Sequence, residues 1–160
     1  MNLDDLGIAR LLHVLAIVLW IGGLGFVTTV VLPTAAELPR PEDRALLFER
    51  LERRFSWIAR GAILVAGISG FYMVAKFQMW DRFHQLSFWW MHAMVALWAI
   101  FTLLLFVAEP FWLHRLFASR MRHDPDHALR TVLIGHWILL LLSVATIGAA
   151  VAGAHGYLTN

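Results

Sequence analysis

Residues 11–26 read LLHVLAIVLWIGGLGF, a run without a charged side chain that contains one histidine. The run free of Asp, Glu, Lys and Arg continues to residue 36. About 20 apolar residues suffice to cross the hydrocarbon core of a bilayer as an α-helix. The stretch therefore predicts a transmembrane helix. His13 needs a partner within it, because an unpaired ring nitrogen in hydrocarbon is costly.

Three more segments have the length and apolar composition of transmembrane helices. With the first, we expect spans over about residues 9–34, 57–78, 86–109 and 131–154. Lipid offers the backbone no hydrogen bonds, so each span must be helical. Little sequence remains outside the spans. The sequence predicts a single all-α integral membrane domain over residues 1–160, built as a four-transmembrane-helix bundle.

Charge and cysteine content exclude several classes of protein. The chain has no cysteine, which excludes disulfides, thiolate metal sites and cysteine-ligated iron–sulfur clusters. The arginines lie beside the spans, where they suit lipid headgroups, so we expect no nucleic-acid partner. Asp4 and Asp5 precede the first span where a secretory signal would carry positive charge. We therefore expect the first span to be retained.

The distribution of arginine and lysine predicts the orientation of the bundle. Three such residues flank the spans on the side of the termini, and ten lie on the other side. The three are Arg10, Lys76 and Arg82, and the ten are Arg40, Arg44, Arg50, Arg53, Arg54, Arg60, Arg115, Arg120, Arg122 and Arg130. Positively charged loops remain in the cytoplasm. We expect a multi-pass protein of the bacterial inner membrane with both termini in the periplasm.

The segment between the first two spans, residues 41–55, reads PEDRALLFERLERRF. A proline followed by acidic residues is typical of a helix start. Leu47, Leu51 and Phe55 then recur at helical spacing among charged residues. This pattern predicts a short cytoplasmic interfacial helix between the first and second spans.

His13 in the first span and His92 in the third both lie in the outer half of the bundle. Their depths differ by about four residues, or roughly 6 Å of helix rise, which helix tilt can absorb. Neutral imidazole is a common metal ligand, and two facing imidazoles are what a b-type haem requires. We expect His13 and His92 to be the axial ligands of one haem iron.

Other residues fit a flat macrocycle between the helices. Five glycines remove side-chain bulk, and four tryptophans supply flat apolar walls: Gly22, Gly23, Gly25, Gly67 and Gly70, with Trp20, Trp89, Trp90 and Trp98. Glycine also serves plain helix packing, and tryptophan also marks the membrane interface. His136 is a candidate for a second, inner haem, although no partner histidine lies at its depth. Arg60 is a candidate partner of a haem propionate or a lipid phosphate.

Two alternatives remain open from the sequence. The first is a copper-handling membrane protein that uses His13, His92 and the outer methionines: Met91 and Met94 flank His92, and thioether and imidazole ligands suit Cu(I). The two methionines share a helix face, whereas His92 points about 100° away, so the three do not converge simply. In the second alternative the protein is a non-catalytic assembly subunit whose histidines only pack.

The segment HVLAIVLWIGG, residues 13–23, resembles the first helix of two related groups. These are the copper-resistance D type domain and the bacterial membrane protoporphyrinogen oxidase, a four-helix protein reported to bind haem b. The resemblance implies that His13 is functionally required. The third helix of that oxidase has a Trp–Leu–x–x–Lys pattern, but Met94 stands here where the lysine would fall.

We therefore expect a haem-b-binding membrane protein that exchanges electrons with a quinone or a periplasmic redox protein. A haem with both axial positions filled transfers electrons rather than binding oxygen. If the protein is an enzyme, it is an oxidoreductase whose chemistry belongs to the cofactor. A stripe of small residues in the fourth span seals the bundle or joins two copies as a homo-oligomer: Ala145, Gly148, Ala149 and Ala152.

Overall fold

A computed structural model describes residues 3–113, 119–120 and 124–158, which form helices and, within these ranges, no strand. Four helical stretches are long and apolar enough to cross a membrane: Asp5–Ala36, Glu42–Lys76, Leu86–Trp112 and Asp126–Ala154. The predicted all-α bundle of four spans is confirmed. The chain is a multi-pass membrane protein.

The arginine-rich end of the bundle is called the inner end below, and the end with the chain termini the outer end. The first span is one long helix with a wider turn near its inner end. Helix α1 (Leu3–Phe26) continues through a π-helical turn, η1 (Val27–Val31), into α2 (Leu32–Ala36). Pro33 in α2 has no N–H and would crowd the carbonyl of Thr29 four residues earlier. The wider π turn before it relieves that crowding.

The second span belongs to α3 (Pro41–Lys76), a helix of 36 residues. Such a helix is about 54 Å long, whereas the hydrocarbon core measures about 30 Å. The apolar part, residues 57–76, is sufficient to cross it. Residues 41–55 are helical, as expected for the interfacial helix, but they continue without a break into the second span.

A short connection at the outer end joins the second and third spans. Gln78 has a φ of 52°, in the left-handed region, and there the chain leaves the axis of α3. Two 3-10 turns follow, η2 (Met79–His84) and η3 (Leu86–Phe88). Helix α4 (Trp89–Leu103) then begins the third span.

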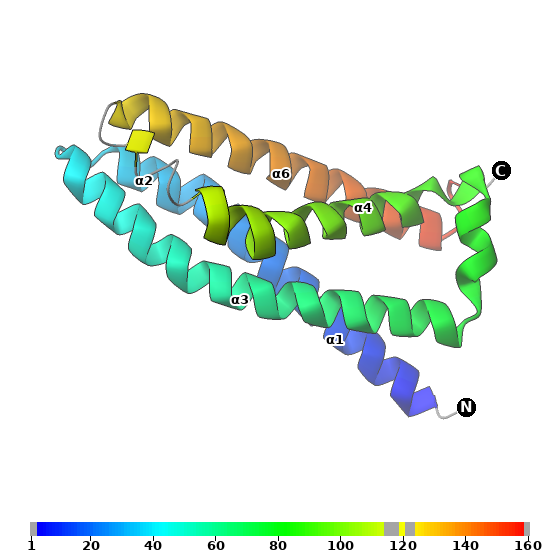
Figure 1. Ribbon diagram of the computed structural model, residues 1–160. Coiled ribbons are helices and arrows are strands. Elements are labelled where there is room, and N and C mark those ends of the chain that lie inside the picture. The colour runs from blue at the N-terminus through cyan, green and yellow to red at the C-terminus, as the bar shows by residue number, and fades with distance from the viewer. Residues whose placement is uncertain (1–2, 114–118, 121–123, 159–160) are drawn as a thin grey trace.

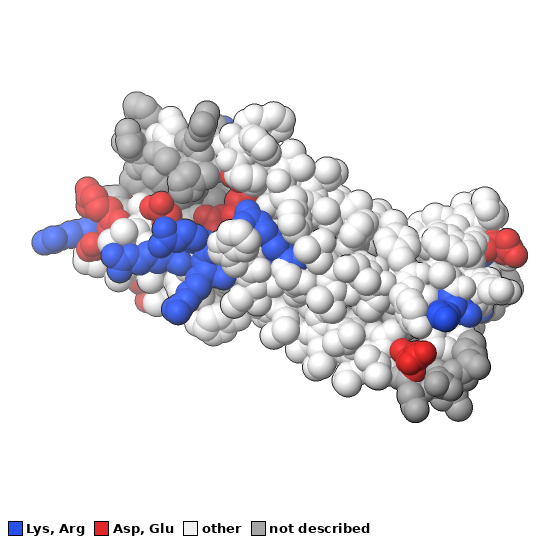
Figure 2. All heavy atoms as spheres, turned by 60° about the horizontal axis from the view of Figure 1, so that its bottom comes forward, with Lys and Arg blue, Asp and Glu red and all other residues white. Residues whose placement is uncertain are grey.

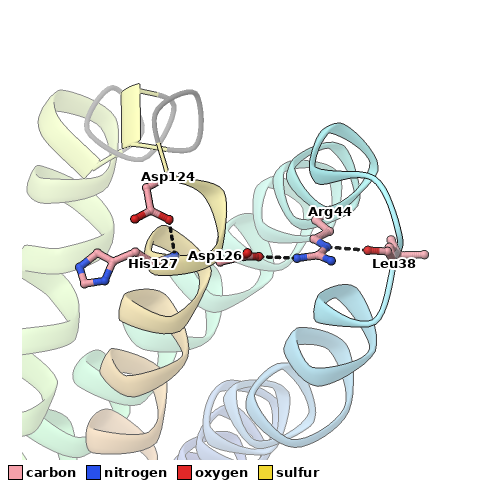
Figure 3. A network of polar contacts seen from close by, with 5 residues as sticks. All are labelled: Leu38, Arg44, Asp124, Asp126 and His127. Atoms are coloured by element: carbon pink, nitrogen blue, oxygen red, sulfur yellow. Dashed lines mark hydrogen bonds and ion pairs between the residues drawn. The ribbon is translucent and has the colours of Figure 1, made fainter.

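The third span ends in a π-helical segment, η4 (Leu104–Leu113), which contains Pro110. The fourth span is α6 (Pro125–Ala154). Asp124 caps this helix, since its carboxylate accepts a hydrogen bond of 3.0 Å from the backbone N–H of His127 (Figure 3).

Arg44, in the first turns of α3, ties the start of α6 to the connection between α2 and α3 at the inner end of the bundle. Its guanidinium lies 2.6 Å from the carboxylate of Asp126, and its Nε donates to the carbonyl of Leu38 (Figure 3). Asp126 is 81% exposed. An exposed ion pair of this kind contributes about 0–1 kcal/mol.

The helices form a bundle in which α1 crosses α3 and α4 runs beside α6 (Figure 1). Rings from the first and third spans meet in the core, where Trp20 and Phe101 lie 4.8 Å apart in a T-shaped contact. Figure 2 shows a broad band without charged side chains between two charged ends. Most of the arginine and lysine gathers at the end where α3 begins. The uncharged band is the surface that lipid covers.

Candidate functional site

The side chain of His13 is directed at α3. Its Nδ1 lies 2.8 Å from the carbonyl oxygen of Ala66 and 3.1 Å from the hydroxyl oxygen of Ser69. The Ser69 hydroxyl donates its own proton to the carbonyl of Val65. Both neighbours of Nδ1 therefore act as acceptors, so Nδ1 carries the proton. In the neutral ring this leaves Nε2 unprotonated, with a free lone pair.

Gly70 allows this approach. A Cβ added at Gly70 would lie 3.0 Å from Cε1 of His13 and 3.4 Å from Nδ1. These distances are too short for an undisturbed ring. The absence of a side chain at position 70 thus lets the imidazole lie against the α3 backbone.

Of the other four glycines highlighted by the sequence, two accommodate rings of the chain itself, and Gly25 meets the side chain of Leu140. Phe55 fills the space beside Gly23, and Trp98 lies against Gly67, where an added Cβ would be 2.7 Å from its ring. The indole N–H of Trp98 donates to the carbonyl of Ile63 at 3.0 Å. Gly22 faces open space, with nothing within 4 Å. The rings packed against Gly23 and Gly67 therefore occupy space that the sequence had suggested for a macrocycle.

His92 is turned toward the outer connection. Its Nε2 lies 2.9 Å from the carbonyl oxygen of Phe83 in η2, and the ring of Phe83 packs edge-on against it. Nδ1 also lies 3.4 Å from a carbonyl oxygen, that of Phe88, but the contact of Nε2 is shorter, so Nε2 is the protonated nitrogen of the neutral ring. His92 is exposed. In this arrangement its Nε2 has no free lone pair for a metal.

The core contact between Trp20 and Phe101 sets the relative depth of the two histidines. His13 lies seven residues before Trp20, and Met94 lies seven residues before Phe101. His92 is therefore two residues, or about 3 Å of rise, from the level of His13. The two rings lie at similar depth, but their hydrogen bonds go to different elements of the bundle.

A haem between these helices requires one free nitrogen on each ring. His13 meets this requirement, and its bond to a backbone carbonyl is the usual second-shell support of a ligating histidine. His92 meets this requirement only after its Nε2 releases the carbonyl oxygen of Phe83. The residues present thus supply one free imidazole nitrogen, on His13, whereas the nitrogen of His92 is engaged by the outer connection.

A second free polar nitrogen lies on the same face of α1. Trp20 is only 5% exposed, and its indole N–H has no hydrogen-bond partner in the part of the chain that the structure describes. His13 and Trp20 are seven residues apart, so they point in nearly the same direction. Both conspicuous residues of the HVLAIVLWIGG segment therefore carry a ring nitrogen without a hydrogen bond to the described residues.

The methionines near His92 do not assemble a site with it. Met91 is 3% exposed and belongs to the packed interior, whereas His92 is exposed. The two side chains therefore leave α4 on different sides. Met94 is half-buried. Within the described ranges, no group of three or more His, Asp or Glu side chains is placed to hold a metal ion.

His136 lies near the inner end of α6, where its Nδ1 is 3.0 Å from the carbonyl oxygen of Val132 on the same helix. The ring is half-buried. Its hydrogen bond leaves Nε2 free in the neutral form, as in His13. His136 therefore remains a candidate for a single ligand.

Arg60 is paired with a carboxylate that the sequence analysis did not consider. Its Nη2 lies 3.3 Å from Oε1 of Glu109, and its Nε donates to the carbonyl of Leu105 at 3.0 Å. The hydroxyl of Ser56 donates to the same carboxylate at 2.6 Å. The guanidinium is thus already neutralised, and a propionate or lipid phosphate would have to compete with Glu109.

Glu52 lies close to this pair, one turn before Ser56 on α3 and outside the apolar segment 57–76. Burial raises the pKa of its carboxyl to about 7, and the carboxylates of Glu109 and Glu49 add to the effect. The inner end of the bundle therefore holds a carboxyl group that exchanges its proton near neutral pH.

The sequence does contain a signal for this ion pair. Arg60 stands near the start of the second apolar run, and Glu109 stands at the end of the third. Both ends face the same side of the membrane, so the two opposite charges lie at similar depth. Ionisable residues within spans are rare and usually paired.

No protein-family model, no curated protein and no solved structure matches the chain. The resemblance carried by residues 13–23 therefore stays a prediction from the sequence.

Proposed function

We propose that the protein is an integral membrane haem-b protein with His13 as an axial ligand of the iron and His92 as the second. One observation carries the proposal. Nδ1 of His13 donates to the Ala66 carbonyl, which leaves Nε2 as a fixed, unprotonated nitrogen inside a membrane span. Backbone carbonyls commonly orient ligating histidines in this way. The unsatisfied N–H of Trp20 on the same face supports a guest with a hydrogen-bond acceptor.

The second axial position depends on a movement of His92. Rotation of its side chain away from the Phe83 carbonyl frees Nε2. The ring already lies at a depth close to that of His13. The hydrogen bond to Phe83 is exposed, and such a bond contributes only about 0.5–1.5 kcal/mol, which a coordination bond readily offsets.

Bound between two imidazoles, a haem supplies one-electron transfer. We propose a quinone or a periplasmic redox protein as its partner, because His13 and His92 lie in the outer half of the bundle. The arginine distribution supports an orientation with both termini in the periplasm of a bacterial inner membrane, which we propose for this protein. Among the described residues, Gly148 meets nothing within 4 Å, which supports a homo-oligomer packed along α6.

The absorption spectrum of the purified protein in detergent tests the proposal. We expect a Soret band and, after reduction, a b-type α band. His13→Ala should abolish haem retention, and His92→Ala should lower it strongly. His155→Ala is the matched control, because His155 is exposed and bonds only to Val151 of its own helix. Normal haem content in both His13 and His92 variants would reject the assignment.

A specific observation favours a second candidate, the non-catalytic assembly subunit. The rings of Phe55 and Trp98 fill the space beside Gly23 and Gly67, so the role of the two glycines here is close packing. A colourless protein without bound metal would support this reading. A colourless protein that retains copper in elemental analysis would instead support the copper-handling alternative, with His13, His92 and the methionines Met91 and Met94.

A further inference from the structure

Three arginines and one tryptophan share one face of α3 at its inner end. Arg50, Arg53, Arg54 and Trp57 stand at positions i, i+3, i+4 and i+7, which are neighbours on a helix. Together they line an open pocket of about 370 Å³. This volume is at the lower end of the range of about 300–1,000 Å³ for small-ligand sites. The pocket suits a compact group rather than a macrocycle.

The acidic residues of α3 lie on a different stripe. Glu52 faces Glu109 and Glu49, and Ser56 and Arg60 continue the same line toward the third span. At 100° per residue, this line is rotated by about a quarter turn from the face with the arginines. Glu49 is the exception, because it stands four residues before Arg53 and adjoins it, so the acids of the helix offset only part of the charge of the three arginines.

The three arginines also lack ion-pair partners. The ion pairs that join two described residues are Arg44–Asp126 and Arg60–Glu109, and neither contains Arg50, Arg53 or Arg54. The three side chains are exposed. Figure 2 shows positive side chains concentrated at this end of the molecule. The pocket thus carries a local excess of positive charge.

The pocket lies at the depth of lipid headgroups. Trp57 begins the apolar segment 57–76 and is 69% exposed on the outside of the bundle, as is typical of tryptophan at the membrane interface. Arg53 and Arg54 lie one helical turn farther from the membrane centre than Trp57, about 5–6 Å along the axis of α3. Each headgroup layer is about 5–7 Å thick.

We propose that Arg50, Arg53, Arg54 and Trp57 form a binding site for the phosphate group of an anionic phospholipid. Each planar guanidinium can donate two parallel hydrogen bonds to phosphate oxygens. The indole of Trp57 covers the start of the acyl chains. A lipid is the better source than free phosphate, because the pocket opens at the membrane surface beside the exposed indole of Trp57.

Native mass spectrometry of the full-length protein in detergent tests the site. We expect phosphatidylglycerol to be retained about tenfold more strongly than phosphatidylcholine. The triple variant Arg50→Gln, Arg53→Gln, Arg54→Gln should lose about tenfold in this preference. The matched control Arg40→Gln, Arg120→Gln, Arg130→Gln removes equal charge from the same end and should retain the preference.

A second variant separates site geometry from charge. Replacing Arg50, Arg53 and Arg54 by lysine preserves the charge and the exposed helix, but it removes bidentate bonding. We expect a clear loss of phosphatidylglycerol retention. An unchanged lysine variant, or an equal loss in the control triple, would show diffuse attraction and overturn the site. Displacement of the lipid by millimolar inorganic phosphate would also overturn it.

Discussion

Nδ1 of His13 lies 2.8 Å from the carbonyl oxygen of Ala66, a backbone group that belongs to another transmembrane helix. Within a helix, the carbonyl of residue 66 already accepts from the N–H of residue 70. It uses its second lone pair for the imidazole. This bond satisfies one nitrogen of the only histidine in the first span and fixes the direction of the other.

Gly70→Ala should displace the His13 ring from this carbonyl. The added Cβ would lie 3.0 Å from Cε1, and the ring is held in place by its hydrogen bond. We expect a loss of about 1–3 kcal/mol in the free energy of unfolding, together with weaker haem retention under the proposed function. Thermal unfolding in detergent measures the first effect. Gly61→Ala in the same helix meets nothing within 4 Å and should unfold like the parent protein or at a higher temperature.

Arg60→Met should destabilise the inner end of the bundle, because it leaves Glu109 half-buried without its cation. Both side chains of this pair are less than 20% exposed. We expect a loss of about 1–3 kcal/mol. Arg44→Met, whose partner Asp126 is 81% exposed, should cost less than about 1 kcal/mol. Chemical unfolding followed by tryptophan fluorescence compares the two, and equal losses would contradict the different burial of the pairs.

Glu52→Gln should increase stability above neutral pH. The pKa of Glu52 is raised to about 7 in the folded protein from an ordinary value of 4.5, so the fold disfavours the ionised carboxylate. The penalty is absent below pH 4.5, grows between pH 4.5 and 7, and is complete above pH 7. Unfolding temperatures at pH 5 and pH 8 measure it. A stabilisation of the same size at both pH values would contradict the assignment, and exposed Glu37→Gln controls for the lost charge.

Labelling of single cysteines should reveal the orientation of the bundle. The chain has no cysteine of its own, so each engineered thiol is unique. Leu86→Cys, at an 89% exposed position in the outer connection, should react with a membrane-impermeant maleimide added to intact cells. Arg40→Cys at the opposite end should react only after lysis. The reverse pattern would invert the proposed topology.

The location of the polar groups shows where sequence reasoning succeeded and failed. The sequence indicated that His13 needs a partner, and it placed His13 and His92 at similar depth. It did not reveal that Ala66 and Gly70 receive the ring of His13, or that His92 turns to Phe83. Backbone carbonyls have no sequence signature, so no pattern of side chains could identify them.

The sequence by itself determined the four spans, because long uncharged runs in lipid have no stable form other than a helix. It also determined the charge asymmetry between the two ends. Only the tertiary structure decided which face of each helix turns inward, and thereby the contact of His13 with Gly70 and the pairing of Arg60 with Glu109. The physical reason is that a span is apolar on all sides. Its hydrophobic pattern therefore does not mark a buried face, and the rotation of each helix is set by close packing against its neighbours.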